Sequence, residues 1–172
     1  MQEQKESFFK KFYTSFEFGI VTTVSFLIGI YITHLFGGGM PVIGGLWVAI
    51  SAIIVLQDTR EITKHFAYIR VVGSLIGSLV AGVVLAIFII NYYVIFLIVF
   101  LAVLVCEVIN FKEGLRLAAL TSVIIIAVSL VDPSVNFIIN VTARFVESCC
   151  GSFIAIIIRY ITHYGSIYLA KK

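Results

Sequence analysis

Residues 69–90 read IRVVGSLIGSLVAGVVLAIFII and carry a single charged side chain, that of Arg70. A helix needs about 20 consecutive apolar residues to cross a hydrocarbon core of about 30 Å. Polar and apolar residues do not alternate at period two, which disfavours a membrane β-barrel. A helix also satisfies its own backbone hydrogen bonds in lipid. The stretch therefore predicts a transmembrane α-helix.

Five further apolar segments of similar length surround it, at about 18–36, 41–56, 92–109, 115–131 and 141–161. The 172-residue chain is 61% apolar and 12% charged, with a mean hydropathy of +1.13. A soluble domain carries about 25% charged residues. We therefore expect an all-α integral membrane protein with six transmembrane helices. Its domain would span residues 18–161, between a cytoplasmic amphipathic segment at 1–17 and a cytoplasmic tail at 162–172.

The basic residues gather at alternate ends of the expected helices. Apart from Arg144, they precede the first helix, lie between the second and third and between the fourth and fifth, or follow the sixth: Lys5, Lys10, Lys11, Arg60, Lys64, Arg70, Lys112, Arg116, Arg159, Lys171 and Lys172. By the positive-inside rule both termini are cytoplasmic. We expect a multi-pass protein of the bacterial inner (cytoplasmic) membrane. No small-residue cleavage site follows the first apolar segment, so we interpret it as a retained helix.

The second half of the sequence resembles the first half when the sequence is aligned with itself at a shift of 74 residues. Polar and small residues then superpose: Asp58, Arg70, Ser74, Gly77 and Ser78 fall on Asp132, Arg144, Ser148, Gly151 and Ser152. This predicts two three-helix repeats, at about 18–90 and 92–161. An odd number of helices inverts the second repeat in the membrane, as in many secondary transporters. The alternative is chance similarity between apolar segments of like composition.

Two motifs carry a resemblance to a known family. Residues 45–57, GLWVAISAIIVLQ, look like the second-helix signature of the fusaric-acid-resistance-like, or aromatic acid exporter, superfamily. Residues 70–78, RVVGSLIGS, resemble its Arg-x-x-Gly-Thr-x-x-Gly motif, with Ser74 in place of Thr. The resemblance covers the membrane part of the family; larger members add a cytoplasmic domain and often a second membrane half. The resemblance implies export of aromatic or other organic acids through a pathway formed at or near a dimer of six-helix units. The chain is also similar to the membrane region of plant aluminium-activated malate transporters, which are dimeric anion channels.

Charged residues inside the apolar segments are the first site candidates. An Arg at mid-membrane costs about 2.5–3.5 kcal/mol on insertion scales, so it normally has a partner. Arg144 and Glu147 are three residues apart and can pair on one helix face. The pair either fixes the sixth helix, or Arg144 binds a substrate carboxylate for which Glu147 competes. Arg70 either anchors the third helix on the cytoplasmic side or gathers anions at the inner mouth.

Two aromatic candidates have a plain alternative role. Trp47 is the only tryptophan, and either lies in an aromatic belt near the outer face or stacks on an aromatic substrate. His34 is either a lone interfacial histidine or part of a proton relay.

Small residues recur every four positions in the third and sixth helices. The sets are Gly73, Gly77 and Ala81, and Gly151 and Ala155. Such faces let helices approach closely. We expect the third and sixth helices to pack on each other or across a dimer.

Catalytic chemistry finds no support in the sequence. There is no Ser-His-Asp grouping, phosphate-binding loop or His/Cys metal cluster, and no basic soluble face for nucleic acid. We therefore predict no enzyme, no catalytic residues, no cofactor and no metal site. The predicted function is a transporter or channel for small organic anions, working in the lipid bilayer as a homodimer of half-size units. The alternative is an accessory or structural subunit of a larger efflux assembly.

Overall fold

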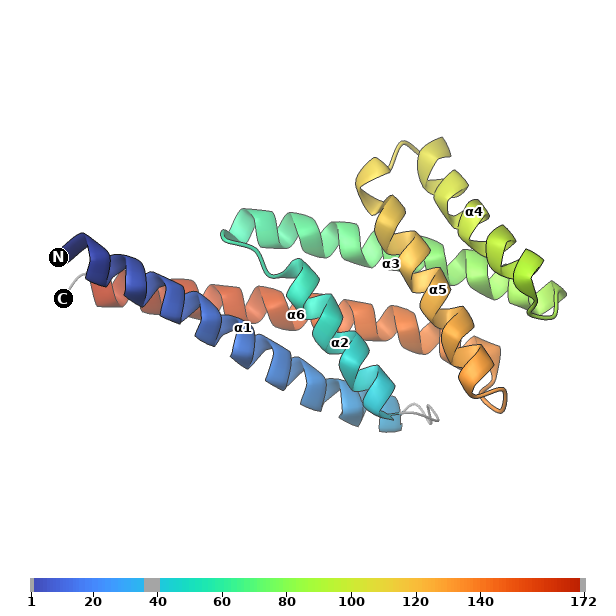
Figure 1. Ribbon diagram of the computed structural model, residues 1–172, viewed down its shortest axis with the longest axis horizontal. Helices are drawn as coiled ribbons and strands as arrows, with labels where there is room; N and C mark the ends of the chain where they lie inside the picture. Colours follow the sequence, from blue (N-terminus) through green and yellow to red (C-terminus); the bar gives the residue numbers. More distant parts are fainter. Residues whose placement is uncertain (1, 36–40, 171–172) are drawn as a thin grey trace.

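The computed structural model describes residues 2–35 and 41–170, with side chains in 11–35 and 41–162. Over these residues the protein has helices and no strand (Figure 1). The six α-helices are α1 (Gln2–Leu35), α2 (Pro41–Val55), α3 (Arg60–Ile87), α4 (Tyr92–Val108), α5 (Leu115–Val131) and α6 (Phe137–Ala170). A 3-10 turn, η1 (Lys112–Gly114), leads into α5. The all-α prediction is confirmed.

Four of the helical stretches are long and apolar enough to cross a membrane, which makes this a multi-pass membrane protein. They are Lys11–Leu35, Arg60–Ile87, Lys112–Val131 and Phe137–Thr162. The helices α2 and α4 are apolar but have only 15 and 17 residues. At 1.5 Å per residue they measure about 23 and 26 Å, less than the hydrocarbon thickness of about 30 Å. Local thinning of the bilayer or polar residues at their ends can make up such a difference.

Three helices extend beyond the apolar segments that predicted them. The helix α3 begins at Arg60 rather than near residue 69, because the Thr59 side chain caps it by accepting a hydrogen bond from the Ile62 N–H at 3.3 Å. The helix α1 runs through the amphipathic segment, and α6 continues to Ala170. Hydropathy marks only the part of a helix that is apolar enough for lipid, so it gives no signal for these polar turns.

The centre of the bundle is formed by α3 and α6, which lie side by side and run in opposite directions (Figure 1). The helix α2 packs on α1, α3 and α6, whereas α5 packs on α3, α4 and α6. Within the described residues, the backbones of α2 and α5 do not approach each other closely. Each therefore covers a different part of the same central pair.

The chain links gather at two ends of the bundle. In Figure 1 the start of α1 and the end of α6 lie at the left, the link 56–59 lies left of centre, and the link 109–114 lies at the top. The end of α1 and the links 88–91 and 132–136 lie toward the lower right. We call the first of these the basic end, because it carries Arg60, Lys64, Lys112 and Arg116. The predicted orientation would place it in the cytoplasm.

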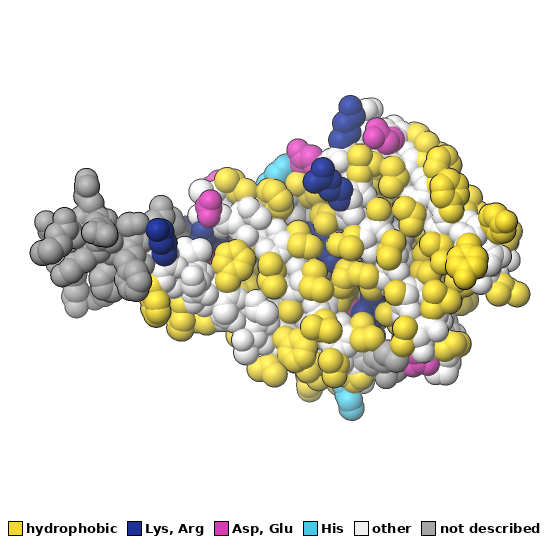
Figure 2. All heavy atoms as spheres, viewed as in Figure 1, with side chains coloured by type: hydrophobic (Ala, Val, Ile, Leu, Met, Phe, Trp, Pro, Cys, Tyr) yellow, Lys and Arg dark blue, Asp and Glu magenta, His cyan; other side chains and the backbone are white. Residues whose placement is uncertain are grey.

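Large apolar side chains cover most of the outer surface (Figure 2). On α4, for example, Tyr92 is 90% exposed and Phe96 is 70% exposed. Water would disfavour such a surface, but lipid solvates it well. The helices therefore bury polar and small residues inside and present apolar residues to the bilayer.

Candidate functional site

Arg70 is buried in the middle of the bundle. Its residue surface is 0% exposed, and its Nε and Nη2 atoms donate hydrogen bonds to Ser51 Oγ at 3.2 and 2.9 Å. The guanidinium carbon lies 5.0 Å from the centroid of the Trp47 ring, close enough for a cation–π contact. The Nη1 atom is buried without a hydrogen-bond partner. The Arg70 side chain therefore points into the bundle rather than toward its outer surface.

The groups around Arg70 leave its charge uncompensated. Ser51 and Trp47, both on α2, are neutral. Among the described residues, no carboxylate lies within ion-pair distance of its guanidinium. A buried charge is costly unless an opposite charge or several hydrogen bonds accompany it. The site around Arg70 thus has one free donor and a positive charge, which favour an anion.

Arg144 is buried as well, but it has a partner. Its Nη1 atom lies 2.9 Å from Glu147 Oε2, and the two residues are 3% and 1% exposed. Thr33 of α1 donates a hydrogen bond to Glu147 Oε1 at 2.9 Å. The predicted pairing of Arg144 with Glu147 is confirmed. The Nε atom of Arg144 remains buried without a partner, so this guanidinium also keeps a free donor.

Three hydroxyl groups meet between the two arginines. Ser74 Oγ donates a hydrogen bond to Ser148 Oγ at 2.9 Å and lies 3.2 Å from Thr121 Oγ1. Arg70 and Arg144 each precede one of these serines by four residues, about 6 Å along the helix axis. Because α3 and α6 run in opposite directions, the two arginines lie on opposite sides of the serine contact. We call Arg70, Ser74, Ser148 and Arg144 the polar row.

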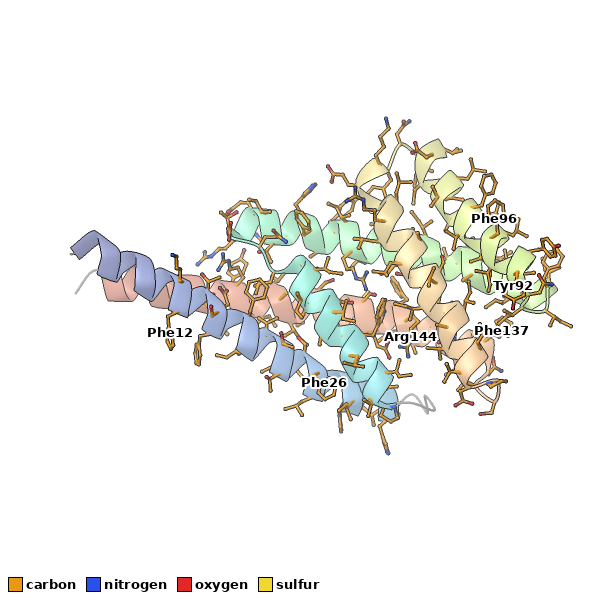
Figure 3. All side chains as sticks on the ribbon, viewed as in Figure 1. Phe12, Phe26, Tyr92, Phe96, Phe137 and Arg144 are labelled. Carbon is orange, nitrogen blue, oxygen red and sulfur yellow. The ribbon has the colours of Figure 1, made fainter. Side chains whose placement is uncertain are left out.

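The polar row lies beside two helices, α2 and α5, whose backbones stay apart. In Figure 3, Arg144 lies between α2 and α5. Figure 2 shows basic side chains in the same region, within a face that is otherwise apolar. The row itself is buried, since Arg70, Ser74 and Ser148 are 0% exposed and Arg144 is 3% exposed.

The helices α3 and α6 pack on each other, as predicted, but their glycines contact other helices. A Cβ atom on Gly77 of α3 would meet the Ala118 carbonyl of α5 at 2.4 Å. One on Gly151 of α6 would meet the Val48 carbonyl of α2 at 2.4 Å. Likewise, one on Gly73 would lie 2.9 Å from the Leu117 Cβ of α5. The glycines therefore pack α3 on α5 and α6 on α2, while serines join α3 to α6.

The two alanines of the same pattern follow the same rule. Ala81 and Ala155 are both 0% exposed. Ala81 belongs to a core cluster with residues of α4 and α5, and Ala155 to one with residues of α1 and α2. Each central helix thus packs against a different pair of outer helices.

Trp47 and His34 occupy contrasting positions. Trp47 is 4% exposed, and its Nε1 atom is buried without a partner, so the lipid-facing aromatic belt expected of it is wrong. It faces Arg70 because both project from helices that pack together. His34 is exposed near the end of α1, whereas its neighbour Thr33 is buried against Glu147. The structure does not bring His34 into the polar row.

A second buried ion pair joins α1 to α6 near the basic end. Both carboxylate oxygens of Glu17 accept hydrogen bonds from Arg159 Nη1, at 3.0 and 2.7 Å, and Oε1 accepts another from Thr162 at 2.6 Å. Glu17 is 3% exposed. The sequence could not predict this pair, because residues 142 apart in the chain show no pairing signal. The sequence also did not single out three other residues of these contacts, Ser51, Thr33 and Thr121. A single hydroxyl residue in an apolar segment was the only signal for each of them.

The described residues hold no group of three or more His, Cys, Asp or Glu side chains suited to a metal ion. The arrangement offers guanidinium groups, hydroxyls and one indole ring, which suit binding of an anion.

Comparison with known proteins places this fold and site in a family. The family described as fusaric acid resistance protein-like matches residues 24–158, which reach from α1 to α6 and include the whole polar row. No curated protein and no solved structure matches the chain. The family match covers well over half of the sequence, and it points to membrane transport or efflux. The chain therefore belongs to the fusaric acid resistance protein-like family of membrane proteins.

Proposed function

We propose that this protein is a half-size transporter or channel for organic anions, exporting aromatic or other carboxylates. The observation that carries the proposal is Arg70, a fully buried guanidinium with neutral partners and a free Nη1 donor. The planar guanidinium fork matches a carboxylate in two parallel hydrogen bonds. A carboxylate at this position would neutralise the charge and satisfy the free donor.

The neighbouring groups favour a carboxylate that carries an apolar or aromatic body. The Trp47 ring lies beside the guanidinium and can pack against such a body. Further along the row, the Glu147 carboxylate already occupies Arg144. A substrate carboxylate that reaches Arg144 would exchange with Glu147, so binding there need not be tight. Weak binding at successive sites lets an anion leave as well as enter.

The proposed working unit is a homodimer. The polar row places two buried arginines inside the bundle, and charges are tolerated at membrane depth only against protein or water. A second copy packed over the face between α2 and α5 would enclose the row in an aqueous path. The unit would lie in the bacterial inner membrane with its basic end in the cytoplasm.

The test is anion flux into proteoliposomes, with chloride and 4-hydroxybenzoate measured side by side, with and without a pH gradient. We expect hydroxybenzoate flux in the wild type and at least a tenfold loss in Arg70→Gln, because one charge-assisted bidentate contact is worth about 1.5–3 kcal/mol. Lys64→Gln removes the same charge outside the polar row and should keep its flux. A response to the pH gradient would distinguish coupled export from passive conduction.

Folding controls decide how a negative result is interpreted. Arg70→Gln should fold, because it removes an uncompensated buried charge and leaves an amide near Ser51. If folded wild-type protein carries no anion at all, the transport proposal is wrong for this chain. The alternative role as an accessory subunit of a larger efflux assembly would then gain support.

A further inference from the structure

A cavity of 580 Å³ opens at the basic end of the bundle. Its wall is formed by Phe66 and Ile69 of α3, Ile54 of α2, and the first turn of α5 with the preceding η1. The volume falls in the range of about 300–1,000 Å³ that small-molecule sites occupy. The cavity is thus large enough for a small organic molecule. We call it the basic-end pocket.

The pocket combines an apolar wall with a charged rim. Phe66 and Ile69 belong to the apolar part, whereas Lys112 and Arg116 supply the positive charges. Both basic side chains are exposed, and the structure gives neither an ion-pair partner among the described residues. The charges are therefore available to a ligand.

A histidine and a glutamate meet on the same rim. His65 Nε2 of α3 lies 2.8 Å from Glu113 Oε2 of η1, and both side chains are more than half exposed. Glu113 adds one negative charge beside the two positive charges of Lys112 and Arg116, so the rim keeps a net positive charge. The contact with His65 also ties α3 to the start of α5 beside the pocket.

The pocket lies one helical turn from Arg70 on the side of the basic end. Phe66 precedes Arg70 by four residues on α3, and Ile54 follows Ser51 by three residues on α2, so each shares a helix face with its partner. A ligand in the pocket would therefore lie next to the Arg70–Ser51 contact, where the buried Nη1 atom lacks a partner.

We infer that the basic-end pocket is the recognition site for the transported anion, and that it selects anions with an apolar body over small inorganic anions. This inference rests on the proposed transport function and adds to it a place and a basis for selectivity. Lys112 and Arg116 hold the anionic head, and Phe66 and Ile69 contact the body. Chloride has no body to bury, and attraction to two exposed charges alone is too weak for its flux to depend on the pocket. From the pocket the anion passes to Arg70.

The test compares 2-naphthoate with chloride in the double variant Lys112→Gln/Arg116→Gln. Both residues are exposed, so folding should be unaffected. We expect the KM for 2-naphthoate flux to rise about tenfold while kcat changes little, because the variant weakens initial binding through charged hydrogen bonds. Chloride flux should change less than twofold. Lys64→Gln serves as the matched control, since it removes a basic side chain at the same end outside the pocket.

A binding measurement separates this inference from the transport proposal. Equilibrium dialysis of radiolabelled 2-naphthoate is done with full-length protein in phosphatidylcholine nanodiscs. Binding that weakens about tenfold in the double variant supports the pocket even if the wild type shows no flux. Equal losses for naphthoate and chloride would reveal a general surface-charge effect and overturn the selectivity. Unchanged binding and KM in the double variant would overturn the site itself.

A wall variant gives a second, independent check. Phe66→Ala keeps both basic residues and removes apolar contact area from the half-buried side of the pocket. It should weaken 2-naphthoate binding severalfold and leave chloride flux unchanged. Equal binding of 2-naphthoate by Phe66→Ala and wild-type protein would contradict the assignment of the apolar wall.

Discussion

Ser74 donates a hydrogen bond to Ser148, the residue 74 positions later in the chain, at 2.9 Å. The same 74-residue shift superposes the first half of the sequence on the second. Equivalent residues touch each other only where two repeats meet at a two-fold axis. The opposite directions of α3 and α6 are those that inverted repeats require (Figure 1). In addition, the last helix of each repeat packs on the middle helix of the other repeat, α3 on α5 and α6 on α2. These relations support the inverted repeat.

The serine contact should contribute measurable coupling between the repeats. We expect Ser74→Ala and Ser148→Ala each to lower the free energy of unfolding by about 0.5–1.5 kcal/mol. The double variant should lose less than the sum, with a coupling of about 0.6 kcal/mol, as for hydroxyl pairs in membrane proteins. Unfolding can be followed by the emission of Trp47, the single tryptophan. Ser152→Ala is the control, because that hydroxyl bonds within its own helix. Strict additivity would argue against the contact.

The close approach of α6 to α2 should make Gly151 intolerant of a side chain. In Gly151→Ala the new Cβ would meet the Val48 carbonyl at 2.4 Å, and backbone cannot move aside as a flexible side chain can. We expect a loss of about 1–3 kcal/mol, as for overpacked cores. Gly82→Ala is the matched control on α3, since its nearest neighbours are Val141 methyl groups at 3.5 and 3.6 Å. Thermal unfolding in detergent compares the two; equal melting temperatures would contradict the packing.

The Glu17–Arg159 pair should hold the basic ends of α1 and α6 together. Glu17→Gln leaves Arg159 without its counter-charge, and we expect about 1–3 kcal/mol of lost stability, less than for a fully buried pair because Arg159 is 16% exposed. The double variant Glu17→Gln/Arg159→Gln should recover much of this loss. Chemical unfolding of the four proteins gives the interaction energy. A double variant as unstable as the sum of the single ones would show that the two residues act separately.

Glu147 should compete with the transported anion for Arg144. If it does, Glu147→Gln weakens the internal partner of Arg144 and should lower the KM for 4-hydroxybenzoate severalfold, whereas Arg144→Gln should reduce flux about tenfold or more. The amide can still accept the Thr33 hydrogen bond, so the local geometry is kept. Flux assays at several substrate concentrations separate KM from kcat.

A purely structural ion pair would behave differently. In that case Glu147→Gln and Arg144→Gln would both lower stability, the double variant would recover it, and flux would follow stability. A KM that is unchanged in Glu147→Gln protein of normal stability would rule out the competition.

The sequence by itself determined the fold class and one contact of the site. In lipid only α-helices and closed β-barrels satisfy the backbone, and apolar segments of bilayer length without period-two alternation form helices, so the six helices could be predicted from hydropathy and periodicity. The Arg144–Glu147 pair could be predicted because residues three apart on a helix share a face. The small residues predicted close packing for the same reason, since spacing along one helix is a local property.

The tertiary structure alone decided which helices meet. Hydropathy does not tell which helices pack together. It could therefore not show that Gly77 packs on α5 or that Glu17 binds Arg159. Nor could it show that Arg70 lies against Trp47 and Ser51. The functional meaning of Arg70 depends on this choice. Near the start of an apolar segment, an arginine is typical of a membrane anchor. Inside a bundle, with neutral partners and a free donor, the same residue is chemically suited to an anion, because burial removes the water that would otherwise solvate its charge.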